Sequence, residues 1–70
     1  MKEELNRAYE MGKQGFKDGL MNSPAGNADF MRWIMRKYNS WDDDLMKIKI
    51  KLYKQYINGW TEEYIKTMVI

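Results

Sequence analysis

Apolar residues recur every three or four positions along most of this chain, which is the period of an α-helix. The first stripe is rich in small residues and comprises Leu5, Ala8, Tyr9, Gly12, Phe16, Gly19 and Leu20. This spacing predicts a helix over residues 3–20. Gly12, Gly15 and Gly19 each cost roughly 1 kcal/mol of helix propensity relative to alanine, so we expect them to serve close packing against another helix. The alternative is a loose helix that frays from Gly15 onward.

The segment 22–27 interrupts this stripe with turn-forming residues. Ser23 before Pro24 is typical of an N-cap followed by the first helical position, or of a simple turn. A second helix is predicted from about Ala28 to Tyr38. Its apolar face carries Phe30, Trp33, Ile34 and Tyr38.

A third stripe follows Asn39. Residues 40–43, beginning at Ser40, have the form of a capping box with Asp in place of Glu. Asp42, Asp43 and Asp44 would then lie in a first turn, where the helix dipole favours negative charge. Residues 46–54 also fit a strand, because apolar positions alternate there with lysines. The acidic first turn favours a helix.

The third stripe continues through Asn58-Gly59 to Met68, so we predict one continuous or slightly kinked helix to the C-terminus. A separate short helix starting at Thr61 is the alternative. The predicted fold is an all-α single domain over residues 1–70, with three or four helices and close glycine-mediated packing. Gly12 and Gly19 should face the helix that carries Trp60. The residues expected inside are Leu5, Tyr9, Phe16, Phe30, Ile34, Leu45, Ile48, Leu52, Trp60 and Tyr64.

Composition argues against catalysis. The chain has no cysteine and no histidine, which removes thiolate chemistry, disulfides and the commonest metal ligand and general base. We therefore expect no enzyme, no metal and no cofactor. No apolar run approaches the ~20 residues that span a bilayer, and residues 1–4 lack the apolar core of a secretory signal. A cytoplasmic protein without membrane association is expected, and its small size makes a homodimer or a docked complex plausible.

Basic and aromatic residues are interleaved over residues 32–56. Cations that contact phosphates beside rings that stack on bases are typical of single-stranded RNA binding. The residues predicted to bind RNA are Arg32, Arg36, Lys37, Lys47, Lys49, Lys51 and Lys54. The structural alternative is that the rings form the core while the lysines cover a solvated face.

The two ends of the chain resemble the ribosome modulation factor family and its short phage-borne relatives. Residues 5–12 match the opening of that family, Gly15-Phe16 and Gly19 continue it, and Pro24 falls in the expected break. Residues 56–60, Tyr-Ile-Asn-Gly-Trp, resemble its closing element with Gly59 and Trp60. The segment from Phe30 to about Leu52 has no counterpart in the pattern. The resemblance implies small residues packed against the Trp-bearing helix, and binding to ribosomal RNA or to a ribosomal protein in a way that restrains translation.

Two functions are therefore expected for a non-enzymatic binding protein. The first is an RNA- or ribosome-associated regulator of translation. The second is a small inhibitor or adaptor, of the kind that phages encode, that binds a host protein. Its contacts would be Met31, Trp33 and Met35, because methionine and aromatic side chains adapt to varied partner surfaces.

Overall fold

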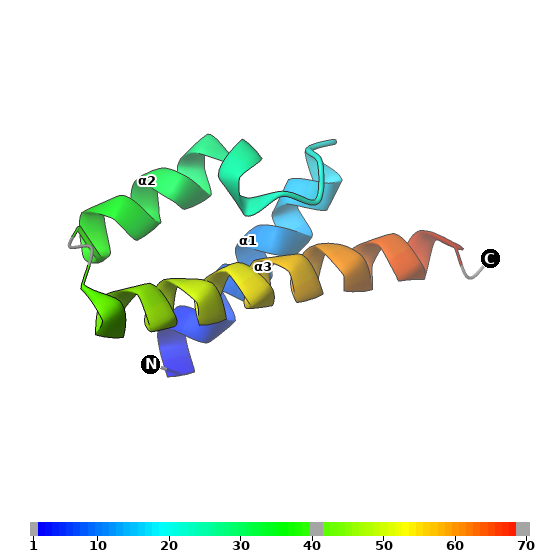
Figure 1. Cartoon of the computed structure of the whole chain (residues 1–70). Helices are drawn as coiled ribbons and strands as arrows, with labels where there is room; N and C mark the ends of the chain where they lie inside the picture. The colour runs from blue at the N-terminus through cyan, green and yellow to red at the C-terminus, as the bar shows by residue number, and fades with distance from the viewer. Residues whose placement is uncertain (1, 40–41, 69–70) are drawn as a thin grey trace.

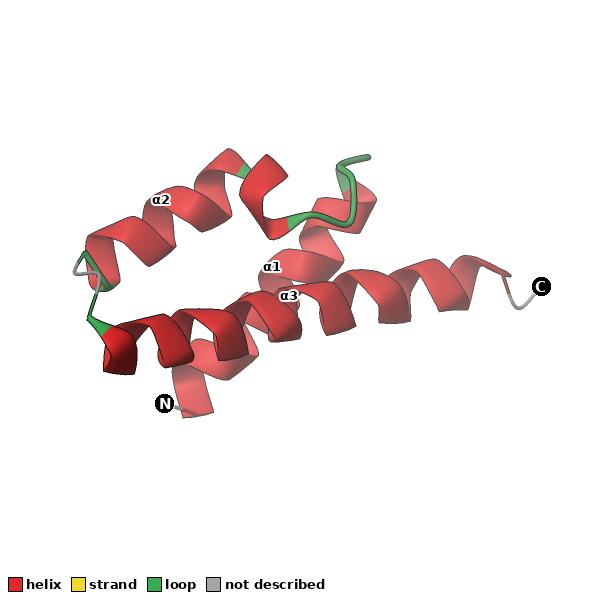
Figure 2. Cartoon of the chain, in the orientation of Figure 1, coloured by secondary structure: helices red, strands yellow, loops and turns green. Residues whose placement is uncertain are grey.

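The computed structural model describes residues 2–39 and 42–68. It contains three α-helices, α1 (Lys2–Lys17), α2 (Ala28–Lys37) and α3 (Asp43–Met68), and one 3₁₀ turn, η1 (Pro24–Gly26), with no strand in those ranges (Figure 2). The predicted all-α class is confirmed. Residues 46–54 are helical, and α3 runs through Gly59 without a break, so neither the strand nor a fourth helix at Thr61 forms.

The helices are arranged around α3. In Figure 1, α1 crosses behind α3, α2 lies above its N-terminal half, and the C-terminal end of α3 projects beyond both. Two neighbours cover part of the circumference of α3 and leave the remainder exposed.

The α1–α3 crossing depends on Gly12 and Gly59. A Cβ atom on Gly12 would overlap the backbone carbonyl of Tyr56 and lie 3.0 Å from the backbone nitrogen of Trp60. A Cβ atom on Gly59 would overlap the backbone carbonyl of Tyr9. The contact is reciprocal, because each glycine meets the backbone of the opposite helix. The predicted glycine-mediated packing is confirmed at Gly12.

Gly19 has a different role from the one predicted. The helix α1 ends at Lys17, and Gly19 has a φ of +78° with nothing within 4 Å of a Cβ atom built there. The backbone nitrogens of Leu20 and Gly19 donate to the carbonyls of Gly15 (2.9 Å) and Phe16 (3.0 Å), which is a Schellman helix end. Gly19 therefore stops α1 and does not face Trp60.

A buried hydrogen-bonded pair joins α2 to α3 in a space left by α1. The Asn27 side chain caps α2 by accepting from the backbone nitrogen of Phe30 (3.0 Å), and its Nδ2 donates to the Tyr56 hydroxyl (2.9 Å). Gly15 leaves the room for this hydroxyl, since a Cβ atom there would overlap it. Thus Gly15 packs against a side chain of α3, whereas Gly12 packs against backbone.

The cap of α3 also differs from the prediction. Asp42 Oδ1 accepts from the backbone nitrogen of Leu45 (2.9 Å), and the helix begins at Asp43. The N-cap is Asp42, while Ser40, the predicted cap, lies outside the described residues. The three aspartates do lie at the helix start, as the dipole argument predicted.

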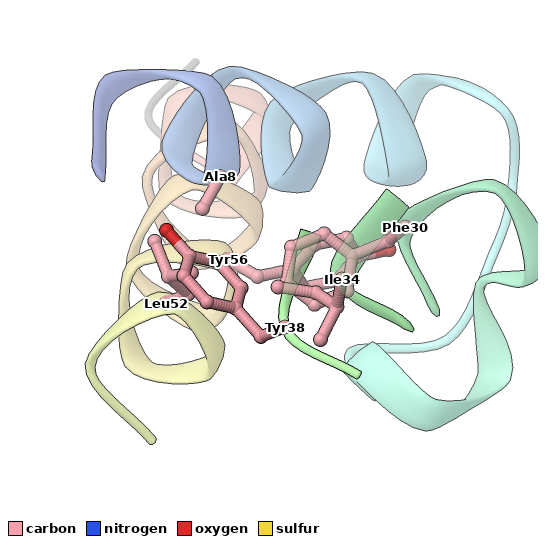
Figure 3. Close-up of a cluster of buried hydrophobic side chains, with 6 residues drawn as sticks. All are labelled: Ala8, Phe30, Ile34, Tyr38, Leu52 and Tyr56. Atoms are coloured by element: carbon pink, nitrogen blue, oxygen red, sulfur yellow. The ribbon is translucent and has the colours of Figure 1, made fainter. Parts of the chain in front are cut away.

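The core is formed by large side chains of α2 and α3 and of Tyr38 at the end of α2, packed against the small side chain of Ala8 on α1 (Figure 3). Of the residues expected inside, Phe30, Ile34 and Leu52 are fully buried, and Leu5, Leu45, Ile48 and Trp60 pack against them at the margin. Tyr9 and Phe16 are half-buried, and Tyr64 is exposed, so its assignment to the core is wrong. The buried hydrophobic residues that the inside set omitted are Ala8, Tyr38 and Tyr56.

Aromatic rings connect α2 to α3. The Phe30 ring lies 4.7 Å from that of Tyr56 and 6.0 Å from that of Tyr53, centroid to centroid. Burial raises the pKa of the Tyr38 hydroxyl, with a further contribution from the charge of Glu4. Side chains therefore hold α2 in place, whereas α1 and α3 meet backbone to backbone.

We expect Gly12→Ala to lower the free energy of unfolding by at least about 2 kcal/mol, because overpacking a tight contact costs ~1–3 kcal/mol and the Tyr56 carbonyl cannot rotate away. The bulkier Gly12→Leu should unfold the chain. Thermal denaturation followed by circular dichroism measures both effects. Gly26→Ala is the control, since its Cβ atom would meet only Ser23 at an ordinary 3.8 Å. A Gly12→Ala protein that melts at or above the wild-type temperature would contradict the backbone contact.

Tyr56→Phe should cost about 1–3 kcal/mol of unfolding free energy, because the buried Nδ2 of Asn27 loses its acceptor. Tyr64→Phe is the matched control, since that tyrosine is exposed, and it should change stability by less than ~0.5 kcal/mol. Urea denaturation of the two variants and the wild type provides the comparison. Equal stabilities for the two variants would show that the Asn27–Tyr56 bond does not stabilise the fold.

Candidate functional site

The seven predicted RNA-binding residues do not form one surface. Lys49 is 1% exposed and lies on the same face of α3 as Leu52 and Tyr56. Successive helical residues are rotated by about 100°, so Lys49 points in a different direction from Lys47 and Lys51. The assignment of Lys49 to an RNA contact is wrong, because its ammonium group lies inside the fold.

The cations of α2 are also divided. Lys37 Nζ lies 3.9 Å from Glu4 Oε1, so this side chain reaches toward α1. Arg32 pairs with Asp29 at 3.1 Å, and both side chains are largely exposed. Arg36, one turn after Arg32, is exposed as well, so the two arginines form the outer edge of α2.

Three lysines of α3 do lie together. Lys47, Lys51 and Lys54 are exposed and separated by four and three residues, which places them on one helix face, called here the lysine ridge. Within residues 2–39 and 42–68 they form no ion pair. Lys51 and Lys54 also line a shallow pocket between α1 and α3, together with Leu5, Gln55 and Asn58.

The predicted protein-binding set is divided between two sides of α2. The Trp33 ring lies 5.1 Å from the Arg7 guanidinium, so it faces α1 and is partly covered. Phe30 faces α3. Around the helix, Phe30 lies between Trp33 and the two methionines, so Met31 and Met35 are on the side of α2 away from α1. Met31 packs against the edge of the core and Met35 is 40% exposed. Thus Trp33 does not share a surface with the two methionines.

An exposed apolar row on α3 was not identified as a surface from the sequence. Ile50 (45% exposed), Ile57 (38%) and Tyr64 (43%) recur at intervals of seven residues, and Met68 (64%) follows one turn later. The sequence signal was the same spacing that marks a buried stripe. The structure shows that the apolar part of α3 is wide enough for Leu52 and Tyr56 to turn inward while this row turns outward.

The apolar row and the two methionines of α2 lie on the same side of the molecule. On α3, Gly59 faces α1, Tyr56 faces α2 and Ile57 belongs to the row. Going around the helix, Tyr56 lies between Gly59 and Ile57, so the row lies on the side of α2 that is away from α1. Met31 and Met35 are turned the same way on α2. We call the surface formed by Met31, Met35, Ile50 and Ile57 the binding face, and Lys47 and Lys54 border it on α3.

The C-terminal half of α3 is attached to α1 by aromatic and ionic contacts. The Trp60 indole nitrogen donates to the backbone carbonyl of Leu20 (2.9 Å), and its ring stacks on Tyr64 and meets the edge of Phe16. Glu63 lies 3.7 Å from Lys13 of α1. Partial burial would raise the pKa of Glu63, but Lys66 of the same helix at 3.4 Å and the lysines of α1 outweigh it and lower that pKa. Trp60 thus joins the C-terminal half of α3 to the end of α1.

Nothing in the described ranges provides a metal centre or a membrane span. Those residues hold no group of three or more His, Cys, Asp or Glu side chains that could bind a metal ion. None of their helices combines the length and the apolar content needed to cross a bilayer.

The fold and this surface define a small three-helix protein with an exposed apolar face. Comparison with protein-family models, with curated proteins and with solved structures finds no match. The resemblance to the ribosome modulation factor family therefore stays a prediction from sequence motifs.

The placement of the lysines can be checked by chemical acetylation followed by mass spectrometry. We expect Lys47, Lys51 and Lys54 to react readily in the native protein. Lys49 should react at least about ten-fold more slowly, because its reaction requires local opening of the fold. In denaturant all four should react at similar rates, which is the internal control. Equal native rates would show that Lys49 is accessible and would restore it to the basic surface.

Proposed function

We propose that this protein is a non-enzymatic binding protein that docks on another protein through the binding face. The observation that carries the proposal is the exposed apolar row of α3 beside Met31 and Met35. Large apolar side chains gathered on one side of a small domain mark interaction sites. Methionine suits such a site because its unbranched side chain adapts to irregular partner surfaces.

The layout of this side agrees with the anatomy of protein interfaces. Apolar residues lie at the centre, and the cations Lys47, Lys54 and Arg32 lie at the border, which is the usual order of an apolar core and a polar rim. The absence of cysteine and histidine from the sequence supports a binding role over a catalytic one.

RNA binding remains the second candidate, and the lysine ridge favours it. Three exposed cations on one helix face could contact successive phosphates, in line with the ribosomal partner that the resemblance implies. However, the rings expected to stack on bases are engaged elsewhere. Tyr56 is buried, Trp33 is covered by Arg7, and Tyr53 packs on Phe30.

Affinity capture from a bacterial extract distinguishes the two candidates. We expect the tagged protein to retain one stoichiometric protein partner at high salt and after ribonuclease treatment. Ile50→Asp and Ile57→Asp should each reduce its recovery about ten-fold or more, because a charge at the centre of an interface costs upward of ~2 kcal/mol. Met21→Asp is the matched control, since Met21 is an exposed methionine outside the binding face.

The opposite pattern would favour the second candidate. Ribosomal subunits or RNA recovered only at low salt, lost with ribonuclease, and lost when Lys47, Lys51 and Lys54 are changed to Gln would contradict protein docking. Recovery that none of the apolar or lysine variants alters would contradict both candidates.

A further inference from the structure

The spacing of the exposed row suits a helical occupant. Ile50, Ile57 and Tyr64 lie seven residues apart along α3, so they form one nearly straight line of apolar contacts. A second helix laid along α3 meets such a line with its own residues at the same interval. Met31 and Met35 would border that helix on the α2 side.

The charge beside Ile50 and Ile57 is positive. Residues 45–61 contain four lysines and no Asp or Glu. Lys49 is buried, but Lys47 and Lys54 lie next to the row, and they form no ion pair within the described parts of the chain. On the α2 side the nearest exposed cation is Arg32, and its pair with Asp29 is largely exposed, so that the pair is weak. An occupant that carries carboxylates along both of its edges would neutralise these cations.

A second copy of this chain fits the surface poorly. A two-fold symmetric pair would bring the same side of each protomer together, and with it Lys47, Lys54 and Arg32 from both copies. Like charges brought together at the rim oppose association. The row therefore requires a partner of opposite charge.

A lipid surface fits less well than a protein helix. An interfacial helix inserts its apolar side chains ~5–10 Å into the bilayer boundary. Here Ile57 and Met35 are more than half covered by their own fold, so they offer side contacts to a neighbouring helix but little to insert.

We propose that the binding face accepts an acidic amphipathic helix of another protein, lying along α3. Its apolar side packs on Ile50, Ile57 and the two methionines, and its flanking carboxylates face Lys47 and Lys54 on one edge and Arg32 on the other. This assignment rests on the proposed function, because it names the partner of the same face.

The test is a selection from a displayed library of 21-residue amphipathic helices. The library keeps leucines at heptad positions and places Asp, Glu, Lys, Arg or Gln at the flanking positions. On the wild-type protein we expect Asp and Glu to be enriched at least about three-fold at those positions. On the Lys47→Glu, Lys54→Glu double variant the preference should reverse to Lys and Arg. The matched control is the Lys2→Glu, Lys17→Glu double variant, which reverses the charge of two exposed lysines of α1. It should leave the preference for Asp and Glu unchanged.

Several outcomes would overturn the inference. These are binders without a charge bias, no enriched binders, cosedimentation with anionic vesicles that Ile57→Asp abolishes, and dimerisation in analytical ultracentrifugation that Ile57→Asp abolishes. The proposed function is judged separately by capture from extract. If Ile50→Asp and Ile57→Asp abolish capture while the charge reversal does not, protein docking stands and the acidic helix fails. If neither apolar variant alters capture, both fail.

Discussion

The close approach of α1 and α3 determines the rest of this structure. Gly12 and Gly59 each place the backbone of one helix against the backbone of the other, at a separation that any side chain would prevent. A 70-residue chain has little apolar surface to bury, so bringing two helices this close gains contact area without large side chains. The larger side chains are then free to fill the space beneath α2. Rings therefore hold α2, whereas the α1–α3 crossing itself needs small residues at Gly12 and Gly59.

The same crossing decides which parts of α3 face solvent. With α1 on one side and α2 adjacent to it, the inward sector of α3 contains Lys49, Leu52, Tyr56 and Gly59. The opposite sector contains the lysine ridge, and the apolar row lies between the ridge and α2. The exposure of these two sectors is thus a geometric consequence of two helices packing on a third. What the fold does not require is that Ile50 and Ile57 should be isoleucines, since a solvated position tolerates polar residues at little cost.

Periodicity was sufficient to predict the helices and the glycine contact, but it could not say which half of a wide apolar stripe faces inward. For this reason Tyr64 was assigned to the core, and Ile50 and Ile57 were not identified as a surface. Gly19 was mispredicted because a glycine at the end of a stripe is equally a packing residue and a helix stop, and only its positive φ separates the two. Lys49 was grouped with its neighbours because they alternate in sequence, although a helix turns them apart. The double role of Asn27 depends on Tyr56, which is 29 residues away, so no local pattern could reveal it.

The family resemblance and most of the proposed interface involve different parts of the chain, with Ile57 the one residue of the binding face that lies within the closing element 56–60. Gly12, Gly59 and Trp60, which carry the resemblance, are the residues that join α1 to α3. Met31, Met35 and Ile50 belong to the segment that has no counterpart in the family pattern, and they supply most of the binding face. A shared scaffold would therefore be compatible with a different partner, because the contacts that build the helix pair and the contacts offered to solvent come from separate residues. During evolution, a change of partner could then alter the segment from Phe30 to Leu52 while the crossing at Gly12 and Gly59 is kept.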